Sequence, residues 1–240
     1  MPSAWLVLPT YNEAENIEGI VRAALPRLTS AVDDPHILIV DDGSPDGTGQ
    51  IADRLAEELA PVEVLHRTAK EGLGRAYLAG FERALGAGAD LVMEMDSDFS
   101  HDPADLPRLI AAAADADLVL GSRYVRGGGV TDWGLFRRLL SRGGSWYARM
   151  VLRVPVRDLT GGFKCFRREA LEGIDYRNTH AEGYGFQIEL TYRTIKAGYR
   201  VVEVPIVFRD REVGTSKMNA RIALEAVWKV PALRTRRYTF

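Results

Sequence analysis

Two carboxylates one residue apart, Asp96 and Asp98, are the residues whose types and spacing most directly suggest chemistry. They follow a short, largely apolar run at residues 91–95. Because side chains alternate faces along a strand, both carboxylates are expected to point the same way just past the strand's carboxyl end. Two such charges repel each other, and a hard cation such as Mg²⁺ or Mn²⁺ relieves this repulsion. A metal held by only two carboxylates keeps coordination sites open for substrate phosphates.

The acidic pair has alternative interpretations. A solvated turn would place the same residues together without any function. An EF-hand loop fits at Asp96, Asp98 and Ser100. It fails at His101, where the loop needs Gly, and at Pro107, where it needs a bidentate Glu. A phosphatase that uses Asp-x-Asp as nucleophile and acid normally carries the pair on its first strand, whereas three predicted strands precede it here.

Length and composition predict one large α/β domain, or one domain with an appendage. The chain has 240 residues and 46% hydrophobic content, enough for a full core. Its single cysteine, Cys165, excludes an internal disulfide and suits a reducing compartment. Residues 1–5 lack the features of a signal peptide, and no run of 18 apolar residues predicts a membrane-spanning helix.

The net charge of −2 conceals a strong asymmetry between the two halves of the chain. Residues 1–120 contain 8 Lys and Arg against 22 Asp and Glu, a net charge of −14. Residues 121–240 contain 23 against 11, a net charge of +12. An acidic half suited to a metal is thus joined to a basic half suited to phosphates or an anionic surface.

Alternating strands and helices organise the first half. Strands are predicted at residues 4–8, 36–40, 62–66, 91–95 and 117–121, and helices at 16–28, 47–60, 72–86 and 103–114. This alternation predicts a mostly parallel, doubly wound sheet, whose ligands bind beyond the strand carboxyl ends. Pro9, Asp41, Asp96 and Arg123 all fall at or just after such ends.

The kind of ligand is narrowed by motifs that the chain lacks. No Gly-x-Gly-x-x-Gly follows the first strand and no Walker lysine loop occurs, which disfavours redox dinucleotides and P-loop hydrolysis. Asp41, in an Asp-Asp-Gly sequence, has two open interpretations: ordinary turn chemistry, or an acceptor of hydrogen bonds from a base or ribose.

Residues 131–155 form an amphipathic, arginine-rich segment, predicted as two helices broken near Gly143 and Gly144. Its apolar side comprises Trp133, Phe136, Leu139, Leu140, Gly143, Trp146, Tyr147 and Met150, and its polar side Arg138, Arg142, Ser145 and Arg149. Two interpretations remain open: a helix packed on the sheet with a solvated face, or an interfacial segment that lies in anionic lipid headgroups.

The remainder of the chain predicts a tight turn at residues 161–163, a helix at 183–197 and a strand at 201–208. Pro205 interrupts that strand and favours an edge position. We divide the chain into a catalytic domain at residues 1–219 and an amphipathic, basic tail at 220–240, with Arg234, Arg236 and Arg237 near its end.

Together these motifs resemble those of a known family. The inverting glycosyltransferases of the GT-A fold have motifs similar to Pro9-Thr10-Tyr11-Asn12-Glu13, Asp41-Asp42-Gly43-Ser44, Asp96-Ser97-Asp98 and Gly121-Ser122-Arg123-Tyr124. The later motifs resemble more specifically the polyprenol (dolichol) monophosphate mannose synthases: Trp133, residues 137–141, Thr160-Gly161-Gly162-Phe163, residues 182–187, Asp210-Arg211 and Gly214 with Ser216-Lys217. The resemblance runs from about residue 4 to residue 219.

The resemblance implies a role for each matching residue. Pro9, Tyr11, Glu13 and Asp41 would hold the guanosine of GDP-mannose, while Asp96 and Asp98 would bind Mg²⁺ or Mn²⁺ on its diphosphate. Arg211 and Lys217 would close over the same phosphates. Arg123, Arg137 and Ser141 would receive the lipid phosphate. Ser97 stands where the family usually has Ala, and Ser100 where some members have a metal-binding Gln, so the third ligand is either Ser100 or water.

The expected reaction is transfer of mannose from GDP-mannose to a polyprenyl monophosphate with inversion. A sugar hydroxyl acceptor would need a general base, whereas a phosphate monoester is already an anion at pH 7 and needs cations such as Arg123 and Arg137 to position it. Open alternatives are UDP-glucose or another nucleotide sugar as donor, and a nucleotide-sugar-binding subunit without turnover. We expect a peripheral protein on the cytoplasmic face of the membrane and no nucleic-acid partner. A membrane-anchoring subunit is an open possibility as a protein partner.

Overall fold

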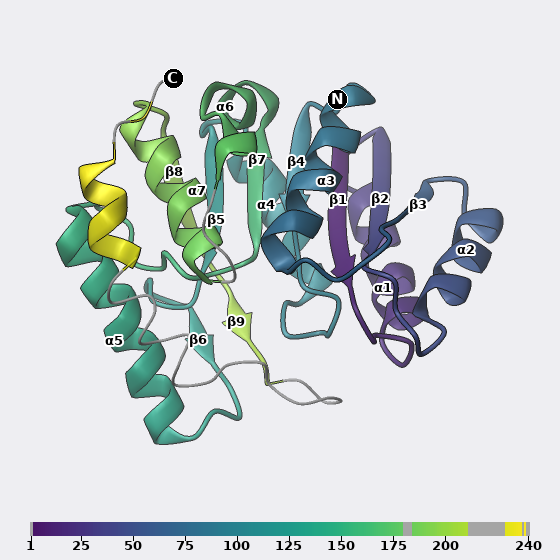
Figure 1. The fold of residues 1–240 in the computed structure, drawn as a ribbon, viewed down its shortest axis with the longest axis horizontal. Coiled ribbons are helices and arrows are strands. Elements are labelled where there is room, and N and C mark those ends of the chain that lie inside the picture. Colours follow the sequence, from purple (N-terminus) through teal and green to yellow (C-terminus); the bar gives the residue numbers. More distant parts are fainter. Residues whose placement is uncertain (1, 180–183, 211–228, 237, 239–240) are drawn as a thin grey trace.

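The computed structural model describes residues 2–179, 184–210, 229–236 and 238. Its centre is a seven-stranded sheet in the order β3-β2-β1-β4-β7-β5-β8 (Figure 1). The strands are β1 Ser3–Thr10, β2 Asp34–Asp41, β3 Val62–His66, β4 Leu91–Glu94, β5 Leu118–Ser122, β7 Lys164–Arg167 and β8 Val201–Pro205. All pairings are parallel except those of β7, which runs antiparallel between β4 and β5. The mostly parallel α/β sheet expected from the sequence is confirmed.

Helices cover both faces of the sheet and enclose two apolar cores. They are α1 Ile17–Thr29, α2 Thr48–Glu58, α3 Leu73–Gly86, α4 Leu106–Ala112 with the short 3₁₀ turn η1 Pro103–Asp105 before it, α5 Leu135–Leu152, α6 Arg168–Gly173, the 3₁₀ turn η2 Tyr176–Asn178 and α7 Tyr184–Lys196. Helix α1 illustrates why they form: Ile17, Ile20, Val21, Ala24 and Leu28 recur at helical spacing and are all buried.

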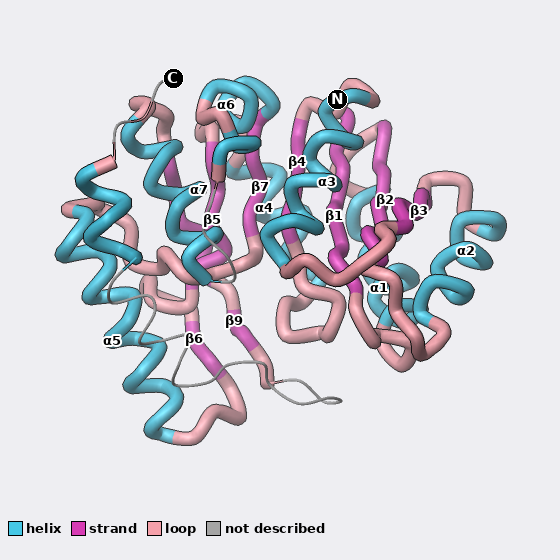
Figure 2. Tube along the Cα trace, in the orientation of Figure 1, coloured by secondary structure: helices cyan, strands magenta, loops and turns pink. Residues whose placement is uncertain are grey.

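The carboxyl ends of the parallel strands share one edge of the sheet, where the connecting loops gather (Figure 2). The amino-terminal end of α7 lies at the same edge. Next to it a small two-stranded sheet pairs β6, Gly129–Val130, with β9, Val207–Phe208. Strand β8 stops at Pro205 and occupies the sheet edge, as the proline predicts.

Helix α5 is one continuous helix, so the predicted break near Gly143 and Gly144 is wrong. Glycine lowers helix stability by about 1 kcal/mol relative to alanine. Tertiary packing overrides this penalty, since Ser145, Ala148 and Leu152 on the other side of the helix are buried. Trp133, expected in the same amphipathic stripe, lies before the helix and is only 6% exposed.

The described part of the C-terminal tail is packed against the domain. Residues 229–235 are helical and lie beside α5 (Figure 1), and Val230 and Leu233 are buried in the same core cluster as Ala148 and Leu152. Arg234 Nη1 donates a hydrogen bond of 3.0 Å to the carbonyl oxygen of Val151. Residues 220–228 and Arg237 lie outside the described residues.

Candidate active site

The acidic pair lies on the loop that leaves β4 rather than in the strand itself. Strand β4 ends at Glu94, so both residues lie past the end of the strand, and strand alternation alone does not fix their directions. A turn places Asp98 instead. Its Oδ1 accepts hydrogen bonds from the backbone N–H of Ser100 at 3.1 Å and from the Ser100 hydroxyl at 2.5 Å. Phe99 between them adopts a positive φ of 60°.

His101 supports this loop from inside the protein. Its Nδ1 accepts a hydrogen bond of 3.3 Å from the backbone N–H of Asp96, and it lies 3.8 Å from Asp96 Oδ2. Burial lowers the pKa of His101 to about 4, although the Asp98 charge opposes this shift. The imidazole is therefore neutral at pH 7, as an acceptor at Nδ1 requires. Phe163 lies against its ring, with the centroids 5.1 Å apart.

The oxygen donors of this loop fit a hard divalent cation. Asp96 and Asp98 offer carboxylate oxygens, which Mg²⁺ and Mn²⁺ prefer. The described residues contain no group of three or more His, Cys, Asp or Glu that could hold a metal. Ser100 lies next to the pair with its hydroxyl on Asp98. An ion bound here would thus have coordination positions left for water and substrate oxygens.

Asp41 is held rigidly at the end of β2. The register of the parallel pair places it beside Thr10 at the end of β1. Its Oδ1 accepts hydrogen bonds from the Thr10 hydroxyl at 3.2 Å and from the Ser44 hydroxyl at 2.5 Å. Its Oδ2 accepts one from the backbone N–H of Ser44 at 3.2 Å. These bonds fix a buried carboxylate at the edge where a nucleoside is expected to bind.

The other predicted donor-site residues lie at the end of β1 and just after it. The hydroxyl of Ser97 donates a hydrogen bond of 3.0 Å to the carbonyl oxygen of Pro9 in β1, so the loop after β4 is joined directly to the end of β1. The ring of Tyr11 lies 3.8 Å from Lys70 Nζ. Glu13 Oε2 accepts a hydrogen bond of 2.9 Å from Asn16 Nδ2. The structure thus places all of these residues at the carboxyl edge of β1, β2 and β4.

Arg123, after β5, is clamped by a carboxylate that the sequence did not single out. Its Nε and Nη2 each donate a hydrogen bond of 2.7 Å to Asp158, and Nη2 also donates to the Thr160 hydroxyl at 2.7 Å. Burial raises the pKa of Asp158, but the Arg123 guanidinium more than offsets this and holds the pKa below its usual range. The clamp fixes the guanidinium plane of a residue that is only 7% exposed.

Arg137, on α5, lies near Arg123 beside Trp133, and Ser141, one turn further along α5, lies beside Tyr124. The guanidinium carbon of Arg137 is 4.4 Å from the centroid of the Trp133 ring, and that of Arg123 is 5.8 Å away. Arg137 Nη1 donates to both carboxylate oxygens of Asp210 at 2.8 Å. The hydroxyl of Tyr124 donates to Ser141 Oγ at 2.7 Å. The three predicted acceptor-site residues are therefore brought together, whereas Arg211 and Lys217 lie outside the described residues.

Phe208 connects the predicted acceptor residues to the loop that carries Asp96 and Asp98. Its ring centroid is 5.2 Å from that of His101 and 5.3 Å from that of Trp133. The guanidinium carbon of Arg123 lies 5.5 Å from the same ring. Phe208 and His101 therefore lie between Arg123 and the Asp96 carboxylate.

Two buried titratable residues of opposite type, also missed from the sequence, lie beside the loop. Glu94 on β4 is the cross-strand neighbour of Lys164 on β7, and both are almost completely buried. Burial raises the pKa of Glu94 to about 7 and lowers that of Lys164 to about 8, while the attraction between the two charges opposes both shifts. Lys164 Nζ donates to the carbonyl oxygen of Gln187 at 2.9 Å and to its side-chain Oε1.

The residues that sequence reasoning missed differ in the signal they carried. Thr160 and Tyr124 stand inside motifs that were singled out, so only their contacts were unknown. Asp158, His101 and Lys164 are single polar residues without a recognisable spacing. Their contacts with the site become visible only when distant strands are brought together.

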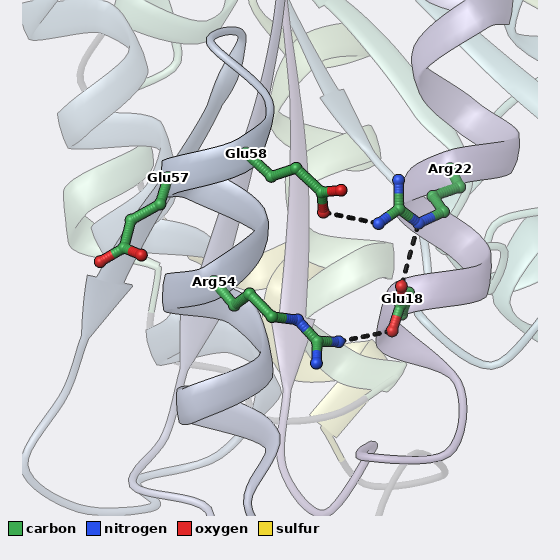
Figure 3. Close-up of a pocket in the computed structure, with 5 residues that line it drawn as sticks. All are labelled: Glu18, Arg22, Arg54, Glu57 and Glu58. Atoms are coloured by element: carbon green, nitrogen blue, oxygen red, sulfur yellow. Dashed lines mark hydrogen bonds and ion pairs between the residues drawn. The ribbon is translucent and has the colours of Figure 1, made fainter.

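A hollow between α1 and α2 contains none of the predicted site residues (Figure 3). It is lined by Glu18, Arg22, Arg54, Glu57 and Glu58. Arg22 pairs with Glu18 at 3.0 Å and with Glu58 at 2.6 Å, and Arg54 pairs with Glu18 at 2.6 Å. Such exposed pairs contribute little to stability. They join two neighbouring helices.

The chain matches known glycosyltransferases in sequence. It is 48% identical over 224 residues to the undecaprenyl-phosphate mannosyltransferase of Micrococcus luteus, covering 93% of this chain and 90% of the relative. It is 50% identical over 227 residues to the polyprenol monophosphomannose synthase of Mycolicibacterium smegmatis, covering 94% and 84%. In the part that the structure describes, no helix is both long and apolar enough to cross a bilayer.

Solved structures with low sequence identity share the fold. The mannosyltransferase PcManGT from Pyrobaculum calidifontis, in complex with GDP-Man and Mn²⁺, superposes with a TM-score of 0.68 at 21% identity, over 99% of this chain and 66% of the other. Glucosyl-3-phosphoglycerate synthase from Mycobacterium tuberculosis, in complex with Mn²⁺ and UDP-Glc, superposes with a TM-score of 0.67 at 19% identity, over 97% of this chain and 79% of the other. The fold is therefore GT-A. With residues 5–175 matching the model of glycosyl transferase family 2, the chain belongs to that family and is a glycosyltransferase.

Proposed function

We propose that this enzyme transfers mannose from GDP-mannose to a polyprenyl monophosphate, with inversion at the anomeric carbon and with Mg²⁺ or Mn²⁺ as cofactor. The observation that carries the proposal is the contact of Phe208 with both His101 and Trp133. It connects the loop of the two carboxylates suited to a donor diphosphate, through His101 and Phe208, to the arginines suited to an acceptor phosphate. The names of two relatives that are 48% and 50% identical to this chain support mannose and a polyprenyl phosphate.

On the donor side, Pro9, Tyr11, Glu13 and Asp41 would hold the guanosine at the ends of β1 and β2. Asp96 and Asp98, with Ser100 or water, would hold the metal, which when bound would neutralise charge on the leaving diphosphate. Arg211 and Lys217 are predicted to contact the same phosphates. The hydrogen bond from Ser97 to Pro9 attaches the loop that carries Asp96 and Asp98 to the end of β1.

On the acceptor side, Arg123, Arg137 and Ser141 would position the lipid phosphate. The phosphate monoester is already anionic at pH 7, so this chemistry needs no general base. It needs cations that offset the repulsion between an anionic nucleophile and an anionic donor, and Arg123 and Arg137 supply them. Attack from the face opposite the diphosphate would convert an α-linked donor into a β-linked product.

Helix α5 supports a peripheral position on the membrane. Leu135, Leu139, Trp146 and Met150 share one face and are 74%, 63%, 64% and 58% exposed. Arg138 and Arg142 are exposed beside this stripe. An apolar stripe flanked by arginines suits an anionic lipid surface, where the acceptor's hydrocarbon chain is dissolved. The lone buried cysteine suits a reducing compartment, so we place the reaction on the cytoplasmic face.

Transfer of radiolabelled mannose from GDP-mannose to a short polyprenyl phosphate tests the proposal directly. We expect transfer with added Mg²⁺ or Mn²⁺ and its loss in the presence of EDTA. Asp98→Asn should abolish transfer while the circular dichroism spectrum and melting temperature stay close to wild type. Turnover of UDP-glucose but not of GDP-mannose would overturn the donor assignment. Undiminished transfer by Asp98→Asn would overturn the metal site.

A further inference from the structure

Gln187 is a buried amide whose orientation is fixed by a charged neighbour. It lies in the first turn of α7, at the carboxyl edge of the sheet, and is 2% exposed. Lys164 Nζ donates to both its backbone oxygen and its side-chain Oε1. Because an ammonium group only donates hydrogen bonds, Oε1 must face Lys164 and the amide nitrogen must face away from it.

The amide nitrogen faces a small space bordered by Gly162 and Asp96. A Cβ atom added to Gly162 would lie 3.6 Å from Gln187 Nε2, 3.7 Å from Asp96 Oδ1 and 3.9 Å from Asp96 Oδ2. The amide and the predicted metal ligand therefore border the same space, into which a glycine projects no side chain. Gly162 itself is partly exposed, so the space lies next to the open side of the site.

Several buried polar groups around this space lack hydrogen bonds. Among the described residues, Gln187 Nε2, both carboxylate oxygens of Glu94 and the hydroxyl of Tyr77 have no hydrogen-bond partner. The Gln187 amide lies close to the Glu94 carboxyl. An amide nitrogen has two N–H groups, so even a completed bond to Glu94 would leave one of them unsatisfied. Buried polar groups without partners are rare in folded proteins and call for an explanation.

The mixture of donors and acceptors identifies the kind of ligand that would satisfy them. A phosphate oxygen only accepts hydrogen bonds, so it could satisfy the Gln187 amide but not the carboxylate oxygens of Glu94. A hydroxyl group both accepts and donates, so it can accept from Gln187 Nε2 and donate to a carboxylate. The ligand that carries several hydroxyl groups next to a metal-bound diphosphate is the pyranose ring of a nucleotide sugar.

We propose that Gln187, oriented by Lys164, binds a hydroxyl group of the transferred sugar in the space beside Gly162. This inference rests on the proposed function, because it needs a nucleotide sugar whose diphosphate lies on Asp96 and Asp98. It adds Gln187 as a specificity-determining residue and Lys164 as a positioning residue. A site that hydrogen-bonds a substrate hydroxyl discriminates against sugars that lack it or present it in another direction.

Two variants test the space from opposite sides. Gly162→Ala fills it, and the fold should tolerate the change, because the new Cβ meets only ordinary van der Waals distances and the backbone of Gly162 is not left-handed. Gln187→Met keeps the length of the side chain and removes the N–H donors. Isothermal titration with Mg²⁺ present should show GDP-mannose binding weakened about tenfold or more in each variant, while GDP, which lacks the sugar, binds within about twofold of wild type.

Thr194→Val is the matched control, since Thr194 is also buried on α7 but its hydroxyl bonds only to the Leu190 carbonyl. We expect it to bind both ligands like wild type. GDP-mannose binding unchanged in Gly162→Ala and Gln187→Met would overturn the inference, and so would equal losses of GDP and GDP-mannose, which would indicate a structural role. A wild-type protein that neither binds nor transfers mannose from GDP-mannose would instead overturn the proposed function, and the inference with it.

Discussion

Single hydrogen bonds position the site more than the motifs themselves do. Ser97 occupies the middle of the acidic motif, where the resemblance leads one to expect Ala and no interaction. Its hydroxyl donates to the carbonyl oxygen of Pro9, a residue 88 positions earlier in the chain. The position of the two carboxylates in the chain could be found from the sequence. The contact that holds their loop against β1 could not, because it joins two segments that are distant in the sequence.

Replacing Ser97 by Ala should weaken that attachment. The lost hydrogen bond should lower the free energy of unfolding by about 1 kcal/mol and raise the Mn²⁺ concentration that gives half-maximal transfer. Urea unfolding and a Mn²⁺ titration of activity measure the two effects. Ser30→Ala is the control, because Ser30 donates a comparable bond to the Arg27 carbonyl on the exposed end of α1. An unchanged metal requirement in Ser97→Ala would show that the bond does not position the carboxylates.

Asp158 contributes to stability through its charge, and the pH dependence of that contribution follows from its pKa. Arg123 holds the folded-state pKa of Asp158 below the unfolded value, so the stabilisation is fully present above about pH 4 and is lost as pH falls through the folded pKa. Asp158→Asn leaves Arg123 buried without its counter-charge and should reduce the free energy of unfolding by about 3–5 kcal/mol at pH 7.

Urea unfolding of wild type and Asp158→Asn between pH 3 and pH 7 measures this difference. The difference in free energy of unfolding between the two proteins should decrease as the pH approaches 3. Asp210→Asn is the control, because Asp210 pairs with Arg137 at a partly exposed position. This substitution should lower the free energy of unfolding by less than Asp158→Asn does. A difference that stayed constant down to pH 3 would contradict the charge-based explanation.

At the scale of helices and strands, periodic segments were predictable and short or packed ones were not. The five strands and four helices of the first half follow apolar periodicity, and all occur within a few residues of the predicted bounds. Strand β7 was missed because its four residues include Lys164 and Arg167, which hide the apolar signal. A break in α5 was predicted at its glycines because helix propensity does not include the stabilisation from burying Ser145, Ala148 and Leu152.

The structure of α5 also sharpens the membrane prediction. The exposed apolar stripe contains Leu139 and Trp146, whereas Trp133 is buried and cannot reach a lipid surface. Leu139→Ser with Trp146→Ser should therefore reduce the fraction of protein that sediments with vesicles containing anionic lipid by several-fold. Vesicles of neutral lipid should bind the wild type less, because the exposed Arg138 and Arg142 contribute about 1 kcal/mol each at an anionic surface.

Sedimentation with defined vesicles provides the measurement. Leu73→Ser serves as the control, since Leu73 is a partly exposed apolar residue at the start of α3. Equal recovery of wild type and the double variant in the supernatant would contradict the interfacial position of α5.

For the molecule as a whole, the charge asymmetry of the sequence has a structural counterpart. Asp41, Asp96 and Asp98 come from the acidic half, and Arg123 and Arg137 from the basic half, yet they meet along one edge of a single sheet. Strand β7 makes this possible, because it comes from the basic half and inserts between β4 and β5. The two halves are therefore expected to unfold together.

Cys165 provides a probe of that cooperativity. It lies on β7 in the middle of the sheet, is fully buried, and burial raises the pKa of its thiol to about 12. Cys165 therefore reacts slowly in the folded protein, because its sulfur is inaccessible and is protonated rather than a thiolate.

At pH 8 an aromatic disulfide reagent should label Cys165 only through global unfolding. The free energy of opening should therefore decrease with urea concentration with the same slope as the free energy of equilibrium unfolding. Ser30→Cys, with an exposed thiol, should label at once. Labelling of Cys165 at a rate independent of urea would show that β7 opens locally and that the two halves are not one cooperative unit.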